Sequence, residues 1–279
     1  MDRRAERDRT EGEKTEDWEE NMKTTNHQAL IVDQFSKQAI PFSTAKTIAD
    51  AKALQMLLDA VGAGADDTVL DVACGGGNVV CAFAKVVRHA TGIDMTPAML
   101  ERARAMAREQ KLENVSWDQG QATALPYADG AFTIVVTRFS FHHFIDPLAV
   151  LKEMVRVCAP RGHVLVADMH TSTDTAKAAE FNRMELLRDP SHVRALPVAE
   201  LKALFPAAGL PPAKASFYEL RDELENLLGR SFPNPGDGDK IREIFRTSAR
   251  DDRLGIPIRL EGTKVNYAYP VAVLTAVKQ

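Results

Sequence analysis

The segment Val69-Leu-Asp71-Val-Ala-Cys-Gly75-Gly-Gly77-Asn78 passes from an apolar strand through consecutive glycines into a helix. Glycine suits such a turn because the chain bends sharply, and a ligand can approach the backbone where no Cβ intervenes. The first turn of the following helix offers unpaired backbone N–H groups to a carboxylate or phosphate. The segment therefore predicts a nucleotide-type ligand, with a purely structural glycine turn as the alternative.

The spacing of the glycines excludes two common nucleotide-binding loops. A dinucleotide site requires Gly-x-Gly-x-x-Gly, but the third position of that pattern is Val80 here. A phosphate-binding Walker loop requires Gly-Lys followed by Ser or Thr, and that combination does not follow. The ligand is therefore expected to be neither a dinucleotide nor a nucleoside triphosphate held by a Walker loop.

Strands and helices alternate around this turn. The segments 133–137 and 164–167 are nearly continuous apolar runs, as expected when helices cover both faces of a sheet. The pattern predicts strands at 68–73, 90–94, 115–118, 131–137 and 163–167 and helices at 44–60, 78–88, 97–110 and 147–158. It therefore predicts an α/β fold with a Rossmann-like, doubly wound and mainly parallel sheet.

The pattern changes after Asp168. Helices are expected near 174–188 and 198–208 and a strand near 213–219, followed by a charged region up to 253. Alternating apolar residues from Gly255 onward predict two strands, which would add an antiparallel C-terminal hairpin edge. The expected organisation is a disordered leader at 1–21, a ligand-binding Rossmann-like domain at 22–170, a helical cap insertion for acceptor binding at 171–254 and sheet-completing strands at 255–279.

Charge and composition limit the class of partner. The formal net charge is −4, which provides no basic field for nucleic acid. No apolar stretch approaches the ~20 residues that span a bilayer. Cys74, Cys81 and Cys158 are an odd set without a Cys-x-x-Cys pair, which suits a reducing compartment and no metal knuckle. We expect a cytoplasmic protein without nucleic-acid partner or membrane span, and a homodimer remains open.

The glycine segment resembles the first motif of class I S-adenosylmethionine-dependent methyltransferases. The resemblance rests on Asp71 preceding Gly75 and Gly77 at the family's spacing. Ala73 stands where the family usually has glycine, so the turn must tolerate a methyl group there. The resemblance implies that S-adenosyl-L-methionine is the cofactor and S-adenosyl-L-homocysteine its product.

Two further segments extend the resemblance. In Gly92-Ile-Asp94-Met95-Thr-Pro97, an acidic residue ends the second strand, where the family binds the ribose hydroxyls, and its neighbour packs on adenine. Gln121 replaces the aspartate that usually binds the adenine amino group, and its side-chain oxygen can accept the same hydrogen bond. The segment 141–162 is similar to the quinone and menaquinone C-methyltransferase subgroup, also called methyltransferase type 11.

The resemblance assigns roles residue by residue. The expected cofactor-binding residues are Asp71, Ala73, Gly75, Gly77, Asn78, Asp94, Met95, Met99, Gln121, Ala122, Thr137 and Arg138. Arg138 either pairs with the donor carboxylate or faces solvent.

His142 and His143 follow the fourth strand and are the candidate catalytic bases, with structural packing as the alternative. No carboxylate or cysteine nearby completes a metal site with them. The segment 34–42, with Phe35 and Phe42, is either a lid over the donor or ordinary core.

The expected activity is methyl transfer to a small-molecule acceptor, quinone-like or a secondary metabolite, by in-line displacement. A protein that binds S-adenosylmethionine but performs other chemistry, or none, is the alternative.

Overall fold

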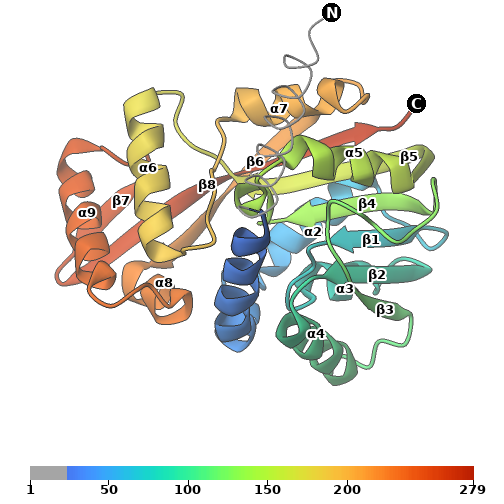
Figure 1. Ribbon diagram of the computed structural model, residues 1–279, viewed down its shortest axis with the longest axis horizontal. Helices are drawn as coiled ribbons and strands as arrows, with labels where there is room; N and C mark the ends of the chain where they lie inside the picture. Colours follow the sequence, from blue (N-terminus) through green and yellow to red (C-terminus); the bar gives the residue numbers. More distant parts are fainter. Residues whose placement is uncertain (1–23) are drawn as a thin grey trace, which may run out of the picture.

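The computed structural model describes residues 24–279, so the leader expected at 1–21 lies outside the described residues. Its centre is one mixed sheet with the strand order β3-β2-β1-β4-β5-β8-β6, and β7 pairs with β8 (Figure 1). The strands are β1 (Thr68–Val72), β2 (His89–Asp94), β3 (Val115–Gln119), β4 (Phe132–Arg138), β5 (Cys158–Met169), β6 (Lys214–Glu223), β7 (Ile258–Glu261) and β8 (Lys264–Val277).

The sheet confirms the expected fold class. Strands β1 to β5 run parallel to their neighbours. Strand β8 then pairs antiparallel with β5 on one side and with β6 on the other. The C-terminal hairpin therefore does add antiparallel strands, but β6 occupies the position beyond β8 in the sheet.

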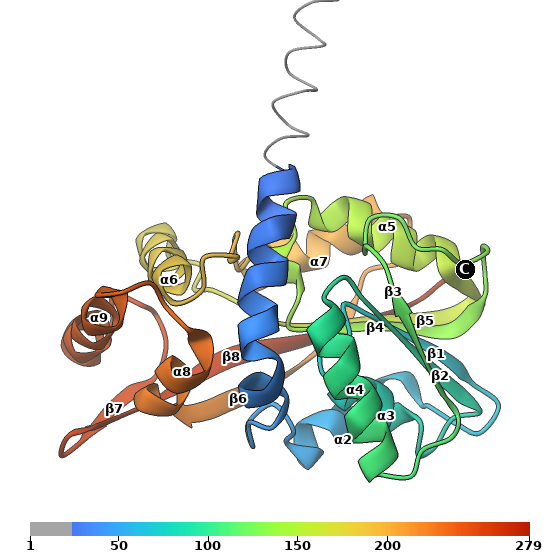
Figure 2. The same cartoon turned by 60° about the horizontal axis from the view of Figure 1, so that its bottom comes forward.

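Helices cover both faces of the sheet, as Figure 2 shows. They are α2 (Ala51–Val61), α3 (Asn78–Phe83), α4 (Pro97–Glu109), α5 (Pro147–Val157), α6 (Thr175–Arg188), α7 (Val198–Ala207), α8 (Leu224–Ser231) and α9 (Asp237–Asp251). A 3₁₀ turn, η1, spans Phe141–His143. Residues 24–43 are also helical and form the blue helix that stands between the two halves of the molecule in Figures 1 and 2.

Helix starts follow side-chain capping, which corrects one expected boundary. Asp146 and Asp174 each accept backbone N–H groups at the starts of α5 and α6. The helix expected at 44–60 begins only at α2, because Asp50 caps it by accepting the N–H of Ala53 at 2.8 Å. The preceding residues form turns instead, so the apolar spacing before Asp50 did not mark a helix.

The parallel half of the sheet lies between two hydrophobic layers. On one face, Leu151 of α5 and Phe205 of α7 pack against the strands. On the other face, Leu57 of α2 and Val80 of α3 do so. This sandwich fixes the carboxyl ends of β1, β2 and β4 at one edge, where open α/β sheets bind their ligands.

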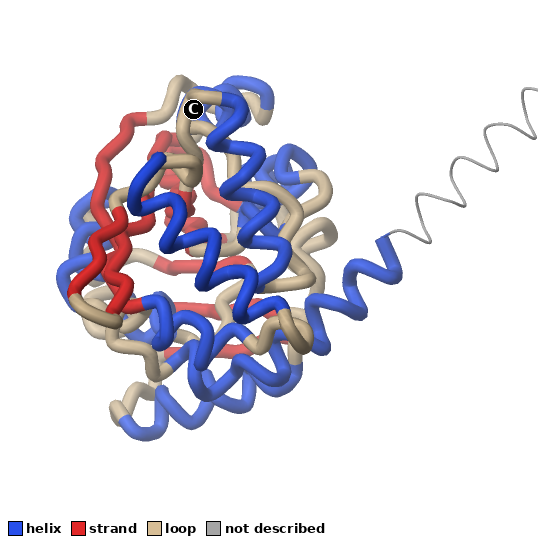
Figure 3. Tube along the Cα trace, turned by 90° about the vertical axis from the view of Figure 1, so that its left-hand side faces the viewer, coloured by secondary structure: helices blue, strands red, loops and turns tan. Residues whose placement is uncertain are grey.

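The antiparallel half carries a core of its own, seen end-on in Figure 3 with helices in front of the strands. Strand β8 serves both cores: Tyr267 and Tyr269 lie in the core under α6, α8 and α9, whereas Leu274 and Ala276 lie under α5 and α7. The cap region is therefore continuous with the sheet and contributes the strand β6. Because the two halves share β8, they are held together by strand pairing.

Helices α8 and α9 occupy the region that the sequence marked only as charged. Helix α9 buries Ile241, Ile244 and Phe245 along one face while its charged side chains face outward. This apolar stripe is narrow and interrupted by charges, so composition concealed it.

Candidate active site

A cavity of about 280 Å³ opens at the carboxyl ends of β1, β2 and β4, beneath the helix at 24–43. It is lined by most of the residues expected to hold the cofactor and by one of the two candidate histidines. These are Asp71, Ala73, Gly75, Asn78, Asp94, Met95, Met99, Gln121, Ala122, Arg138 and His143. We call this space the donor cavity.

Two expected cofactor residues lie outside the lining of the donor cavity. Gly77 has φ +86°, and a Cβ there would lie 2.7 Å from Trp117 and 2.9 Å from Ala103. Thr137 is buried and donates its hydroxyl to the carbonyl of Val72 at 2.7 Å. In this structure both residues hold the frame: Gly77 lets α3 pack closely on α4, and Thr137 joins the ends of β4 and β1.

The acidic residue at the end of β2 is tied to the glycine turn. Asp94 Oδ2 accepts the N–H of Gly75 at 2.8 Å, and its Oδ1 accepts the N–H of Thr96 at 2.8 Å. Each carboxylate oxygen keeps further acceptor capacity. Burial raises the pKa of Asp94, while these N–H groups act in the opposite direction. Asp94 therefore sets the position of the turn and still presents oxygens to the cavity.

Ala73 adopts the left-handed backbone that its place in the turn demands, with φ 57°. For a residue with a Cβ this conformation is strained. The turn tolerates the methyl group, as expected, but at a cost in backbone energy.

Asp71 is the least satisfied polar group of the donor cavity. It is only 1% exposed, and neither carboxylate oxygen has a hydrogen-bond partner among the described residues. Burial raises the pKa of Asp71 well above its ordinary value, the nearby Asp94 adds to this, and Arg138 opposes it. A buried carboxylate without a partner is costly unless a ligand donates to it. The donor set thus fits a molecule with a cationic amino group.

Arg138 is buried, so the expectation that it merely faces solvent is wrong. Its Nη1 donates to the carbonyl of Ile48 at 2.7 Å, and its Nε and Nη2 donate to the Tyr218 hydroxyl at 3.3 and 3.2 Å. The guanidinium carbon also lies 4.4 Å from the centre of the Phe139 ring. Arg138 is therefore a fixed positive charge in the wall that also contains Asp71.

The helix at 24–43 roofs the donor cavity. His27, Gln28, Ile31, Phe35 and Phe42 all line it. The side-chain amides of Gln28 and Gln121 bond each other at 3.2 and 3.4 Å, which links the roof to the adenine end of the expected donor site. The aromatic pair therefore does cover the cavity, and the roof includes further residues that the sequence analysis did not assign.

The lower end of the same helix is seated on the glycine turn. A Cβ on Gly76 would come within 2.4 Å of the Ser43 Cβ, so only glycine admits Ser43 at this position. Asn78 donates to the Ser43 carbonyl at 3.3 Å. On the other side, Gln38 donates to Asp189 at 3.1 Å, which ties the helix to the cap region. The helix thus touches both halves of the molecule.

The two candidate histidines have different surroundings. His142 donates its Nδ1 proton to Asp168 Oδ1 at 2.6 Å, and its backbone N–H reaches Oδ2 of the same residue at 3.1 Å. His142 does not line the donor cavity but lines a smaller space behind it. His143 lines both. Only one of the candidate bases therefore reaches the donor cavity.

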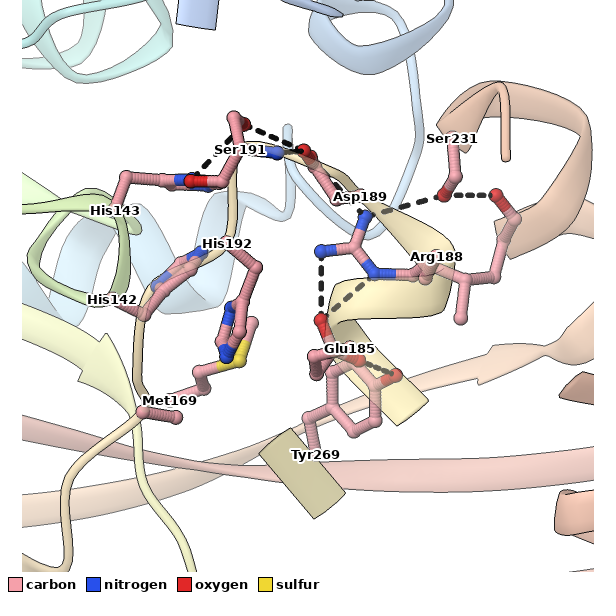
Figure 4. A network of polar contacts seen from close by, with 12 residues as sticks. His142, His143, Met169, Glu185, Arg188, Asp189, Ser191, His192, Ser231 and Tyr269 are labelled. Carbon is pink, nitrogen blue, oxygen red and sulfur yellow. Dashed lines mark hydrogen bonds and ion pairs between the residues drawn. The ribbon is translucent and has the colours of Figure 1, made fainter. Parts of the chain in front are cut away.

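His143 is held as a neutral base. Its Nδ1 lies 2.9 Å from the Ser191 carbonyl, which can only accept, so that nitrogen carries the proton. The Ser191 hydroxyl donates to Asp189 at 2.6 Å, and Figure 4 shows the three residues in a row. Burial, together with the neighbouring His142, lowers the pKa of His143 to about 3. Its Nε2 bonds no other residue of the described chain and is left as a proton acceptor.

Further lining residues come from the turn after β4, which the sequence analysis did not assign. Phe139, Ser140, Phe144, Ile145 and Asp146 all border the donor cavity. Phe139 has φ 58°, a strained conformation that is frequently associated with functional sites. The histidines were chosen because ligands bind at the carboxyl ends of the strands in such sheets, and the same reason applies to these neighbours. Cys74, Gly76, Val79, Gly120 and Thr123 likewise line the cavity without having been assigned.

Within residues 24–279, no group of histidine, cysteine and carboxylate side chains is arranged to hold a metal ion. Across the same part of the chain, no helix is long and apolar enough to cross a membrane.

Comparison with known proteins places this geometry in context. A family model described as a methyltransferase domain matches residues 63–227. The uncharacterized methyltransferase YcgJ of Bacillus subtilis is 29% identical over 248 residues, 88% of this chain and 98% of that protein. The ubiquinone/menaquinone biosynthesis C-methyltransferase of Bdellovibrio bacteriovorus is 38% identical over 109 residues, 38% of this chain and 46% of that protein.

Solved structures agree in fold. The crystal structure of YcgJ from Bacillus subtilis matches with a TM-score of 0.76 at 27% identity, covering 82% of this chain and 98% of that one. Geranyl diphosphate C-methyltransferase from Streptomyces coelicolor, solved with Mg²⁺, geranyl diphosphate and S-adenosyl-L-homocysteine, matches with a TM-score of 0.60 at 16% identity, covering 82% and 79%. The second likeness is one of fold alone.

Proposed function

The chain belongs to the methyltransferase domain family and is an S-adenosylmethionine-dependent methyltransferase, and from that premise we propose that its acceptor is a small organic molecule, quinone-like or a secondary metabolite. The observation that carries the proposal is the unpaired, buried Asp71 in a cavity that also contains His143. Asp71 favours a cationic ligand, and His143 is a neutral imidazole that lines the same cavity. The quinone methyltransferase of Bdellovibrio bacteriovorus supports the quinone-like class.

The charges of the donor cavity suit the amino-acid end of S-adenosylmethionine. We assign the ammonium group to Asp71, which has no hydrogen-bond partner within residues 24–279, and the carboxylate to the fixed charge of Arg138. Asp94 accepts from the ribose hydroxyls with its remaining lone pairs. Met95 and Met99 line the same cavity and offer apolar contact to adenine, and Gln121 accepts from the adenine amino group.

When bound, the donor supplies an electrophilic methyl carbon on a sulfonium sulfur. The protein aligns the acceptor with that carbon and keeps water out, which are the main contributions available to an in-line displacement. The roof formed by Phe35 and Phe42 excludes water from above. His143 Nε2 accepts a hydrogen bond from the hydroxyl, amine or acidic C–H group of the acceptor and so orients and polarises it, while Ser191 holds the proton on Nδ1.

The cysteines favour a cytoplasmic location, which we include in the proposal. Cys74, Cys81 and Cys158 are all free and buried. Burial raises the pKa of each thiol, which keeps it protonated and unreactive. Free thiols are what a reducing compartment maintains.

Calorimetric titration with S-adenosyl-L-homocysteine tests the donor site. The unmodified protein should bind it, and Asp94→Ala should abolish binding because both the ribose contact and the anchor of Gly75 are lost. The matched control is Asp66→Ala, which removes an exposed carboxylate. Circular dichroism must show that both variants remain folded. Unchanged affinity in Asp94→Ala would remove the assignment of that residue.

Mass spectrometry of the protein incubated with methyl-labelled donor and a metabolite extract tests turnover. The expected product is a small molecule carrying the label, formed together with S-adenosyl-L-homocysteine. His143→Ala should slow turnover at least about tenfold while changing donor affinity much less. A rate equal to that of the unmodified protein would return His143 to a packing role.

A further inference from the structure

A smaller cavity of about 40 Å³ lies behind the donor cavity, and we call it the inner cavity. Phe35, Phe42, Ile48, Phe139 and His143 line both spaces. The two cavities therefore adjoin, and these shared side chains form the wall between them. The volume of the inner cavity corresponds to a few water molecules, so it can hold one end of a ligand but not a whole ligand.

The Tyr267 hydroxyl is an unsatisfied group in the wall of this inner cavity. It is buried and has no hydrogen-bond partner among the described residues. Its ring is fixed between Phe245 and Tyr269, with centroid distances of 5.4 and 4.7 Å. A buried hydroxyl without a partner costs free energy that a ligand oxygen could recover.

Arg230 offers a second donor in the same wall. It is 7% exposed, and its Nη1 pairs with Asp222 at 2.6 Å. A guanidinium carries five N–H donors, and a carboxylate engages at most two of them in the usual bidentate arrangement. Arg188 differs, because its Nε and Nη2 engage Glu185 and its Nη1 engages Ser231 (Figure 4). Arg230 therefore keeps donor capacity for a ligand.

The balance of charge around the inner cavity disfavours a charged ligand. Arg188 and Arg230 are each matched by a carboxylate, Glu185 and Asp222, and Asp189 adds a further negative charge. A carboxylate ligand would join an excess of negative charge. A cationic ligand would be repelled by the guanidinium groups of Arg188 and Arg230, which line the cavity. A neutral carbonyl oxygen can accept hydrogen bonds from both Tyr267 and Arg230 without electrostatic repulsion from the charged groups nearby.

We propose that the inner cavity binds a neutral carbonyl oxygen of the methyl acceptor, with Tyr267 and Arg230 as its hydrogen-bond donors. The rest of the acceptor lies against Phe35, Phe42 and Phe139, with its reactive atom toward His143. The acceptor is thus a neutral carbonyl compound with an apolar body. This inference rests on the proposed function and specifies the substrate class.

Ligand-observed NMR with three ring compounds of different charge tests the proposal. The probes are acetophenone, benzoate and benzylammonium, each added to protein saturated with S-adenosyl-L-homocysteine so that the donor cavity is filled. Acetophenone should bind most tightly. Tyr267→Phe should weaken its binding at least about fivefold, because one hydrogen bond is lost. Tyr127→Phe is the matched control, since its hydroxyl bonds Asp118 and does not line the inner cavity.

The outcomes separate this proposal from the donor assignment. Preference for benzoate or benzylammonium, no binding of acetophenone, or equal binding to Tyr267→Phe would each overturn the carbonyl site. Failure of S-adenosyl-L-homocysteine to bind in calorimetry would overturn the proposed function instead. Loss of the fold is not expected in Tyr267→Phe, because the removed hydroxyl has no partner among the described residues. Thermal unfolding of the variant checks this before the probes are added.

Discussion

The left-handed backbone of Ala73 is a local strain in the wall of the donor cavity. Its φ of 57° costs a residue with a Cβ about 1–2 kcal/mol, whereas glycine adopts it freely. Ala73→Gly should therefore raise the free energy of unfolding by roughly 0.5–1 kcal/mol, after the greater entropy loss of glycine is subtracted. Urea denaturation measures it.

The same change at Ala179 is the control. Ala179 is exposed inside helix α6, where glycine should lower the free energy of unfolding by about 1 kcal/mol. Two variants of identical composition change should thus move in opposite directions. A loss of stability in Ala73→Gly would show that the turn is not strained at that residue.

The unpaired carboxylate of Asp71 predicts a conflict between stability and binding. Burial and the nearby Asp94 raise the pKa of Asp71 more than Arg138 lowers it. The charged form of Asp71 is therefore disfavoured in the folded protein. Asp71→Asn should raise the free energy of unfolding at neutral pH by on the order of 1 kcal/mol. The same variant should bind S-adenosyl-L-homocysteine at least about tenfold more weakly, because the donor ammonium loses its ion pair.

Chemical denaturation and calorimetry measure the two effects on one preparation. Asp66→Asn, at an exposed position, should change neither quantity appreciably. Weaker binding together with lower stability would mean that Asp71 supports the fold, and the conflict would not exist.

At the scale of elements, Gly77 governs how closely helix α3 approaches helix α4. A Cβ there would meet Trp117 and Ala103 at under 3 Å, whereas one at Gly209 would meet nothing within 4 Å. Both glycines have nearly the same φ, 86° and 85°. Gly77→Ala should therefore cost the backbone strain plus about 1–3 kcal/mol of overpacking, and Gly209→Ala the strain alone.

Thermal and urea unfolding of the two variants measure the difference. The shared φ cancels the strain, so the remainder reports the packing of α3 on α4. Equal losses of unfolding free energy in the two variants would contradict the packing role of Gly77. Contact with the donor would then remain as its expected role.

Elements were foreseen where an apolar pattern was strong and missed where charge interrupted it. The cores of β1, β4 and α4 follow from continuous or evenly spaced apolar residues. Helix α9 was missed because its apolar stripe lies among many charges. The start of α2 was placed too early because the side-chain cap at Asp50 outweighs apolar spacing.

At the scale of the whole molecule, three buried or half-buried histidines make stability depend on pH. Burial lowers the pKa of His143 to about 3 and also lowers the pKa of His170 and His192. Below the ordinary histidine pKa of about 6.5, the unfolded chain takes up protons that the folded protein refuses. These groups therefore stabilise the fold above about pH 6.5, and the contribution is lost as pH falls toward 3.

Replacing two of these histidines by amides should reduce the pH dependence of the free energy of unfolding. In His143→Asn with His192→Gln, the free energy of unfolding should fall less steeply between pH 6.5 and 4.5, by up to about 1.4 kcal/mol per pH unit for each histidine. Asp71 and Asp94 have raised pKa values and act oppositely in both proteins, gaining stability as pH falls. Urea unfolding across this range measures the slopes. Identical slopes would contradict the neutral state of these histidines.

The sequence by itself determined the fold class, and it predicted a donor site most of whose residues line one cavity. Strand periodicity, glycine spacing and the acidic residue after β2 are local patterns, so they can be read from the sequence without knowledge of tertiary contacts. The donor cavity accordingly contains ten of the twelve expected cofactor residues. The class of protein followed from the order of these motifs along the chain.

Only the tertiary structure decided which groups are buried together. Among the described residues Asp71 has no hydrogen-bond partner, His143 but not His142 lines the donor cavity, and Tyr267 and Arg230 both line the inner cavity. Burial and partnership depend on residues that lie far apart along the chain, such as His143 with Ser191 and Arg138 with Ile48, which no local pattern records. The proposed acceptor site belongs to this second category, because β6, β8 and the helix at 24–43 contribute the walls of the inner cavity from both ends of the chain.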